Sequence, residues 1–468
     1  MKPILYFLLF SIVLASAQDQ WLEKDLTSFT ENYIIKDAVP FVNEDNNQLA
    51  LFFKNRKKIF GYLYNEKQEL ISTISPIEIP KKAQILIGKT YNNDSYTLYF
   101  SNTRKTYFSS ISINFITKNF NVNDNLGIHV KGEKVIDFLI DKHKIYILSI
   151  VKKTSILKTY ELDNNGLVGT KEFDFSNEVI KSDKGWNYNL YHLLYGNPTY
   201  STVELIKNDI PNALEKTSAY TKLYFKKGKL TLTNNLFDRY TYLITIDLDK
   251  STQSFEVINN KDFVKQNLGD NSSSYIFKNY FFNIYSNNKK LNFNIHDLKT
   301  KKLIKSFEIL KDSNITFKNS PIIQEGGELN KYREFEKTSK FLRKITNSKI
   351  GITAYQEGDD IIITLGASEV VQSNNIAIGV ILGGAIGGAI FSSFNSYANT
   401  KSTRINCLFD KEFNHKKGEV PLNSFDKINN FIEDNKLKKH KLQTIFKYKD
   451  NYIWGALDKE TYRLYKFN

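Results

Sequence analysis

The sequence predicts an all-β protein built from repeated four-stranded antiparallel sheets. Short runs rich in β-branched and aromatic residues recur along the chain, and the breaks between them carry Asn, Asp, Gly, Lys or Ser. The clearest example is residues 135–175, where four such runs follow one another. A lone four-stranded meander cannot cover its own hydrophobic faces, so further copies are expected.

A hairpin pattern of apolar strand, polar turn and apolar strand occurs seven times. Its turns fall near positions 45, 93, 143, 228, 279, 358 and 450, so neighbouring turns lie about 50 residues apart, or that plus an extra segment. A third strand follows each hairpin, as in KIFGYLY (58–64), ILKTYEL (156–162) and TRINCLF (403–409). The seven copies predict seven sheets of one design.

This repeat resembles the architecture of a seven-bladed β-propeller, in which four-stranded blades stack radially. The resemblance covers nearly all of residues 18–468, which form a single predicted domain, but it points to no particular family. The WD dipeptide is absent, and no Gly-Gly pair lies in blade phase as in kelch repeats.

The chain ends on the third strand of the seventh repeat, Thr461–Asn468. The missing fourth strand is therefore expected to come from the start of the chain, and we assign it to Ser28–Lys36 (SFTENYIIK). Such a borrowed strand would close the ring and leave no exposed sheet edge between first and last blades.

Residues 1–17 have the form of a secretory signal. Met1-Lys2 precedes an apolar run, and Ala15-Ser16-Ala17 forms an A-x-A cleavage site. The interpretation predicts export to the periplasm, the cell envelope or the medium; a retained membrane anchor is the alternative. Cys407 is the single cysteine, so no internal disulfide is expected.

Four long insertions interrupt the repeat. Three of them, residues 176–217, 312–348 and 421–440, are expected to join the outer strand of one blade to the inner strand of the next. The fourth, residues 371–402, splits the second and third strands of blade six. In an up-and-down blade these two kinds of connection emerge on the same face, so this decorated face is the expected functional face.

The turns between second and third strands would add a basic rim to that face. The formal net charge is +15, from 65 basic and 50 acidic residues, and removal of Lys2 would leave +14. This balance favours an anionic partner, although exposed lysines also serve solubility. The candidate binding residues in these turns are Arg56, Lys57, Lys58, Arg104, Lys105, Lys152, Lys153, Arg239, Lys289 and Lys290.

An uncharged glycine-rich stretch, residues 376–391 (IAIGVILGGAIGGAIF), lies within the insertion of blade six. On a helix its glycines would form one flat stripe suited to membrane insertion or self-association. A helix of this length is about 24 Å long, short of the roughly 30 Å hydrocarbon core, so a loop packed on the disc is the alternative to a membrane contact. The candidate residues are Gly379, Gly383, Gly384, Gly387, Gly388 and Phe391.

Two other segments offer binding or catalytic groups. Trp186, Tyr188 and Tyr191 could stack on sugars from a face loop, or could instead belong to a degenerate blade within residues 176–217. Glu325 and Glu328 flank Gly326-Gly327 and are the carboxylates to test if the protein cleaves glycans, although paired glutamates also cap helices. Residues 424–436 predict an amphipathic helix with Phe425, Ile428 and Ile432 inward.

No catalytic set, metal-ligand spacing or phosphate-binding glycine motif was found, so we expect no metal, no cofactor and no nucleic-acid partner. The leading hypothesis is a non-enzymatic binding or docking module for an anionic membrane, an envelope glycan or an envelope protein. A glycan-active enzyme and a protein-interaction scaffold are the alternatives. The sequence leaves the oligomeric state open.

Overall fold

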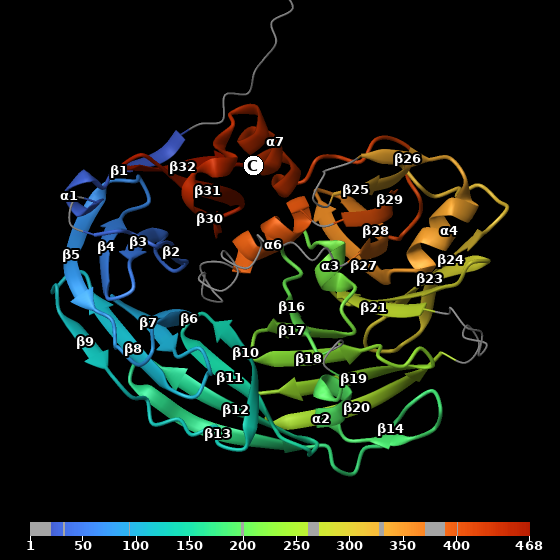
Figure 1. Cartoon of the computed structure of the whole chain (residues 1–468), viewed down its shortest axis with the longest axis horizontal. Helices are drawn as coiled ribbons and strands as arrows, with labels where there is room; N and C mark the ends of the chain where they lie inside the picture. Colours follow the sequence, from blue (N-terminus) through green and yellow to red (C-terminus); the bar gives the residue numbers. More distant parts are fainter. Residues whose placement is uncertain are drawn as a thin grey trace, which may run out of the picture.

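The computed structural model describes residues 20–30, 33–92, 94–197, 201–260, 271–326, 332–369, 389–399 and 401–468. The protein is all-β, and these residues form eight sheets, of which seven have four or five strands. We number these seven sheets 1 to 7 along the chain. They surround a common centre in a propeller-like arrangement (Figure 1).

The seven sheets contain the following strands. Sheet 1 holds β2 (Asp37–Asn43), β3 (Gln48–Lys54), β4 (Lys58–Tyr64) and β5 (Leu70–Glu78); sheet 2 holds β6 (Ile85–Asn92), β7 (Ser95–Ser101), β8 (Phe108–Asn114) and β9 (Phe120–Asn123). Sheet 3 holds β10 (Glu133–Asp141), β11 (Lys144–Val151), β12 (Ile156–Asp163) and β13 (Gly166–Asp174); sheet 4 holds β16 (Val203–Ile206), β17 (Thr221–Lys226), β18 (Lys229–Asn234), β19 (Tyr240–Asp247) and β20 (Thr252–Asn259). Sheet 5 holds β21 (Asn271–Phe277), β22 (Tyr280–Ser286), β23 (Lys290–Asp297) and β24 (Leu303–Leu310); sheet 6 holds β25 (Ile322–Glu325), β26 (Arg333–Phe335), β27 (Lys349–Glu357), β28 (Asp360–Glu369) and β29 (Lys401–Phe409). Sheet 7 holds β1 (Gln20–Asp25), β30 (Lys441–Tyr448), β31 (Asn451–Asp458) and β32 (Thr461–Phe467).

Each of the seven predicted hairpins and each predicted third strand is confirmed. The hairpins are β2–β3, β6–β7, β10–β11, β17–β18, β21–β22, β27–β28 and β30–β31. Their turns favour left-handed backbone; in the β17–β18 turn, Lys227 and Gly228 have φ of 49° and 67°. Positive φ at both central residues is the type I′ geometry that matches the twist of paired strands.

Sheet 7 takes its fourth strand from the start of the chain, but not from the predicted segment. The strand is β1, which pairs antiparallel with β32 and places Leu22 opposite Leu464. Leu22 and Leu26 are buried, and the Trp21 ring lies 4.7 Å from the Tyr448 ring. The assignment to Ser28–Lys36 is wrong because part of that segment lies in the short helix α1 (Thr27–Thr30), where Phe29 stacks on Phe60 at 4.0 Å.

The fourth strand of sheet 6 also lies outside the consecutive run of β27, β28 and β29. The strand order is β26-β25-β29-β28-β27, so β25 precedes the first hairpin of its own sheet in the chain. The link from sheet 6 to sheet 7 therefore leaves from the third strand, β29, and not from an outer strand as predicted. Residues 410–423 must then cross from one end of the sheet to the other.

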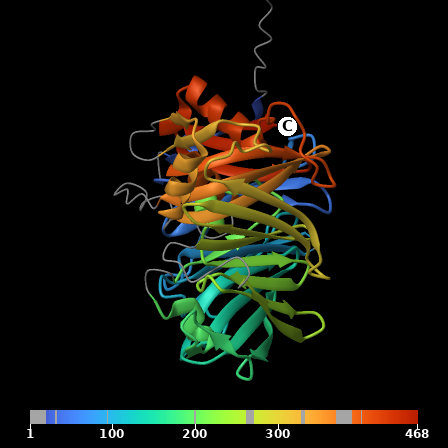
Figure 2. The ribbon, with the colours of Figure 1, turned by 90° about the vertical axis from the view of Figure 1, so that its right-hand side faces the viewer.

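The insertions carry most of the remaining elements. These are the hairpin β14 (Ile180–Lys181) and β15 (Asn187–Tyr188), with α2 (Leu190–Tyr195), α3 (Leu214–Thr217), α4 (Thr338–Thr346), α6 (Ala389–Asn399), α7 (Ser424–Asp434) and the 3-10 turn η2 (Leu437–Lys439). The described part of residues 176–217 forms no separate blade; β16 joins sheet 4 parallel to β17. In the side view, the red helix α7 lies on one side of the disc, which we call the insertion face (Figure 2).

Hydrophobic cores join most neighbouring sheets directly. Sheets 7 and 1 share a core with Phe53 and Leu464, and sheets 1 and 2 share one with Phe52 and Leu98. Further cores join sheets 2 and 3, sheets 3 and 4, and sheets 4 to 6. Sheet 7 has a different partner on its other side, because Trp454 and Ile445 pack with Phe394 of α6 and with Phe425 and Ile428 of α7.

Candidate functional site

The face of sheet 6 that looks toward sheet 7 carries a row of polar residues. Thr353, Thr364 and Asn406 are direct register partners on the neighbouring strands β27, β28 and β29. The Thr364 hydroxyl donates to Asn406 Oδ1 at 2.9 Å, and Ser402 and Arg404 continue the polar face along β29. The three strands thus carry a continuous polar row.

The other face of sheet 6 is apolar. Ile352, Ile363, Ile405 and Cys407 are fully buried in the core shared with sheets 4 and 5. Successive side chains of a strand point to opposite faces, so one strand can serve a core and a polar surface at once. Burial raises the pKa of the Cys407 thiol, which packs there as a small buried side chain.

Helix α7 faces this polar row from the side of sheet 7. Its apolar residues Phe425, Ile428 and Ile432 are buried against sheet 7, as predicted. The opposite side of the helix carries Asp426, Asn429 and Asn430. The amphipathic pattern of α7 therefore places a second polar surface opposite sheet 6.

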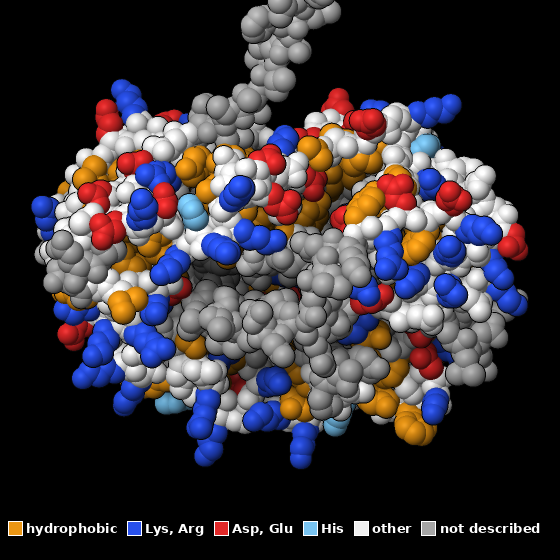
Figure 3. Space-filling model, turned by 45° about the horizontal axis from the view of Figure 1, so that its top comes forward, with side chains coloured by type: hydrophobic (Ala, Val, Ile, Leu, Met, Phe, Trp, Pro, Cys, Tyr) orange, Lys and Arg blue, Asp and Glu red, His pale blue; other side chains and the backbone are white. Residues whose placement is uncertain are grey.

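A cavity of about 270 Å³ lies between these two polar surfaces. Its walls come from β25, β27, β28 and β29, from α6 and α7, from residues 211–214 beside α3, and from the crossing segment at residues 420–422. The space-filling view shows the molecule hollowed in this region, with charged side chains on the rim (Figure 3). We call this space the 6/7 cleft.

The N-terminus of α7 is fixed by a capping box. Asn423 Oδ1 accepts from the backbone N–H groups of Phe425 and Asp426 at 2.7 and 3.0 Å, and the Asn423 N–H donates to Asp426 Oδ2 at 3.0 Å. Such reciprocal bonds satisfy N–H groups that a helix leaves free at its first turn. The cap also positions Asp426 at the cleft wall.

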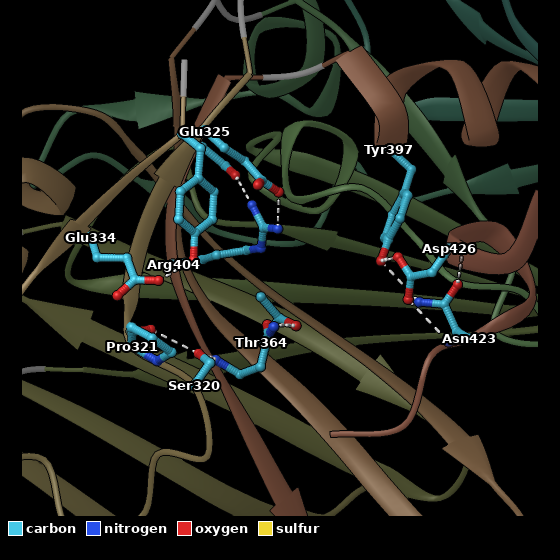
Figure 4. A network of polar contacts seen from close by, with 12 residues as sticks. Ser320, Pro321, Glu325, Glu334, Thr364, Tyr397, Arg404, Asn423 and Asp426 are labelled. Atoms are coloured by element: carbon cyan, nitrogen blue, oxygen red, sulfur yellow. Dashed lines mark hydrogen bonds and ion pairs between the residues drawn. The ribbon is translucent and has the colours of Figure 1, made fainter. Parts of the chain in front are cut away.

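Tyr397 of α6 joins this network (Figure 4). Its hydroxyl donates to Asp426 Oδ1 at 2.7 Å and accepts from Asn423 Nδ2 at 2.9 Å. Burial raises the pKa of Asp426, against the opposing effect of the bond from Tyr397. Burial, followed by the charge of Asp426, raises the pKa of Tyr397 as well.

Glu325 lies at the end of β25 and lines the cleft, so its interpretation as a helix cap is wrong. Its carboxylate forms an ion pair with Arg404, and Arg404 Nη1 also donates to Ser402 Oγ at 2.8 Å (Figure 4). The ion pair compensates both charges at the wall of the cleft. Glu328, its predicted catalytic companion, lies outside the described residues.

The predicted basic turns occupy the positions expected of them. They connect the second and third strands of sheets 1 to 5, which places them on the insertion face. Arg56, Lys57, Arg104, Lys152, Lys153 and Lys289 are exposed. Lys58, Lys105, Arg239 and Lys290 are half-buried. Lys58 and Lys105 lie over the rings of Tyr33 and Phe138.

The predicted aromatic residues lie apart from the 6/7 cleft. Trp186 is 65% exposed at the β14–β15 hairpin. The Tyr188 ring packs 5.3 Å from Phe237, and Tyr191 of α2 packs 5.8 Å from Tyr195. Two of the three rings thus contribute to packing, and Trp186 alone of them is largely exposed.

The glycine-rich candidates Gly379, Gly383, Gly384, Gly387 and Gly388 lie outside the described residues. Phe391 belongs to α6, where its ring lies 6.3 Å from Phe394. Among the described helices, none has the length and apolar character needed to cross a membrane. The described residues also contain no cluster of His, Cys, Asp and Glu suited to a metal ion.

The 6/7 cleft was not recognised from the sequence, although a signal for it was present. In TRINC (403–407), Arg404 and Asn406 alternate with the buried Ile405 and Cys407 in a strand expected to be covered on both faces. Arg404 and Asn406 in such a strand indicate a polar surface within the ring of sheets.

No family model and no curated protein matches the chain. Among solved structures, a prolyl endopeptidase aligns with a TM-score of 0.32 at 9% identity, over 90% of this chain and 46% of its own, so the chain spans less than half of that protein. The dihydro-heme d1 dehydrogenase NirN aligns with a TM-score of 0.30 at 9% identity, over 93% and 67% of the two chains. The cobalt-substituted Synechocystis ACO aligns with a TM-score of 0.29 at 7% identity, over 59% and 62%.

Proposed function

We propose that the protein is an exported, seven-bladed β-propeller that docks on an anionic surface of the cell envelope through its insertion face. In this proposal sheets 1 to 7 are the blades, β1 completes the last blade, and α6 with α7 fills the junction between blades six and seven. The proposed role is binding without catalysis.

The observation that carries the proposal is the unequal distribution of charge between the hairpin turns of the two faces. The turns between second and third strands of sheets 1 to 5 are rich in Lys and Arg, and their acidic residue is Asp238. Among the described residues, none of the six exposed basic side chains in these turns forms an ion pair. Lys and Arg side chains project along the lower edge of the molecule in the space-filling view (Figure 3).

The turns on the opposite face mix both signs. Lys142 pairs with Glu44 at 3.4 Å, Lys411 pairs with Asp359 at 2.7 Å, and Lys449 pairs with Glu66. When positive and negative side chains lie close together, their fields largely cancel a short distance from the surface. Unpaired positive charges, in contrast, attract an anionic partner. The insertion face is therefore the favoured docking face.

The apolar sequence at residues 376–391 would add a hydrophobic contact on the same face. Its described end, Ala389–Phe391, begins α6. We expect that removing residues 375–392 weakens attachment to vesicles without changing the dependence on salt, because apolar contacts are not screened.

Sedimentation with phosphatidylcholine vesicles, with and without anionic phosphatidylglycerol, tests the docking. Replacing Arg104, Lys105, Lys152 and Lys153 with Gln should weaken binding to anionic vesicles by roughly a thousandfold, because each basic residue near the surface contributes about 1 kcal/mol. The matched control replaces four lysines in turns of the opposite face, Lys67, Lys118, Lys250 and Lys299, and should bind nearly as well as the unaltered protein. Equal losses in both variants would contradict a directional docking face.

A further inference from the structure

We propose that the 6/7 cleft binds a small, neutral, polyhydroxylated ligand of the size of one sugar ring. This site is separate from the basic turns of the insertion face.

The first argument is the chemistry of the walls. Sheet 6 contributes Thr364 and Asn406, and α7 contributes Asn429 and Asn430. Side-chain amides and hydroxyls both donate and accept hydrogen bonds, as sugar hydroxyls do. Two polar surfaces with this composition face each other across one cavity.

The second argument is charge. Glu325 is paired with Arg404, and both carboxylate oxygens of Asp426 accept hydrogen bonds from Tyr397 and Asn423. The charged groups in the walls are therefore already satisfied, and a charged ligand would have to break these contacts or remain uncompensated in a partly buried site. A neutral ligand neither breaks these contacts nor buries an uncompensated charge.

The third argument is a buried acceptor in the wall of the cleft. Asn212 is 2% exposed, and its Nδ2 donates to the carbonyl oxygens of Lys207 and Ile210 at 2.9 and 3.1 Å. Within the described residues its Oδ1 is buried without a hydrogen-bond partner, and Asn212 lines the cavity. A buried acceptor of this kind is costly unless a ligand or water donates to it.

Size and shape narrow the ligand further. The cavity of about 270 Å³ lies just below the range of about 300–1,000 Å³ that is typical of pockets for drug-sized ligands. Tyr397 and Tyr355 both line it, and the Tyr355 hydroxyl donates to the Pro421 carbonyl at 3.3 Å. Aromatic rings beside amides suit the apolar and polar sides of a sugar ring.

Titration calorimetry and ligand-observed NMR with glucose, galactose and N-acetylglucosamine test the proposal, with glucuronate and glucosamine as the charged arms. We expect one neutral sugar to bind with a Kd of about 1 mM or tighter, and the charged forms to bind at least tenfold more weakly. Absence of binding by the three neutral sugars, or tighter binding by a charged one, would overturn the proposal.

Two variants locate the site. Asn406→Ala should weaken sugar binding about tenfold by removing one hydrogen-bonding side chain from the polar row. The control Asn294→Ala removes an equivalent cross-strand bond, from Ser306 Oγ to Asn294 Oδ1 at 2.7 Å, in sheet 5, and should bind sugar unchanged. Equal binding by both variants, with unfolding temperatures matched, would exclude the cleft. The Gln variant of the basic turns should keep sugar binding, so failure of vesicle docking and failure of this site are distinguishable.

Discussion

Sheet 7 meets its two neighbours in different ways. Toward sheet 1 it forms a sheet-on-sheet core, in which the Phe53 ring lies 5.1 Å from Tyr462 and Ile453 and Leu464 are fully buried. Toward sheet 6 its apolar face is covered by Phe394 of α6 and Phe425 of α7. The first junction is a dry core, whereas the second contains helices and a polar cavity.

The difference shows how a repeated sheet can acquire a site. A sheet face that another sheet covers carries mainly apolar residues. Once inserted helices satisfy the apolar face of sheet 7, the facing side of sheet 6 is free to carry Thr353, Thr364 and Asn406. The 7/1 junction has no such insertion and keeps aromatic residues on both sides.

The largest expected effect is at the 7/1 junction. Phe53→Ala should lower the free energy of unfolding by about 3–5 kcal/mol, because it opens a cavity in a fully buried aromatic cluster. Urea denaturation measures this loss.

The comparison variant in the 6/7 cleft is Thr364→Ala. We expect it to lower the free energy of unfolding by about 1 kcal/mol, since one hydrogen bond is lost beside a cavity that water can enter. Equal costs at the two positions would show that the junctions do not differ in packing.

A smaller effect is expected at the wall of the cleft. Asn423→Ala removes the cap of α7 and should cost about 1 kcal/mol of stability, because two backbone N–H groups lose their acceptor. It should also weaken sugar binding, since the cap fixes the helix that carries Asn429 and Asn430. The matched control is Asn189→Ala, which removes the cap of α2 outside the cleft, where Asn189 Oδ1 accepts from the His192 N–H at 2.8 Å. If both variants weaken sugar binding equally, the effect is general loosening and not a property of the cleft.

The smallest effect is a pH dependence confined to the cleft. Burial holds the pKa of Asp426 above its usual value in the folded protein. The folded state therefore disfavours the ionised carboxylate, and this group lowers the free energy of unfolding as pH rises from about 4 through its folded pKa. Asp426→Asn removes this contribution.

A series of thermal unfolding measurements between pH 3.5 and 7 checks the sign. The unaltered protein should lose stability relative to the Asp426→Asn variant as pH rises, and the difference should become constant above the folded pKa. If the unaltered protein instead gained stability relative to the variant as pH rises, the hydrogen bonds from Tyr397 and Asn423 would outweigh the effect of burial on Asp426. The wall of the cleft would then stabilise an anion.

The repeat could be predicted because its information is local. Each hairpin, such as IGITAY and IIITLG around the turn at residues 356–360, contains its own strand pattern and its own turn residues. The amphipathic helix around Phe425 was also predicted, since its period can be read over three turns. The candidate residue Glu325 was found, but its partner Arg404 was not, because 79 positions separate them.

The amino-acid sequence alone determined the all-β class, the seven hairpins and the basic turns, because strand alternation and turn chemistry act between near neighbours. Only the tertiary structure decided which distant segments, β1 and β25, complete sheets 7 and 6, since short outer strands gain their stability from partners far along the chain. It also decided that α6 and α7 come between two sheets. The cleft exists because these helices cover one apolar face and leave the opposite sheet free to be polar.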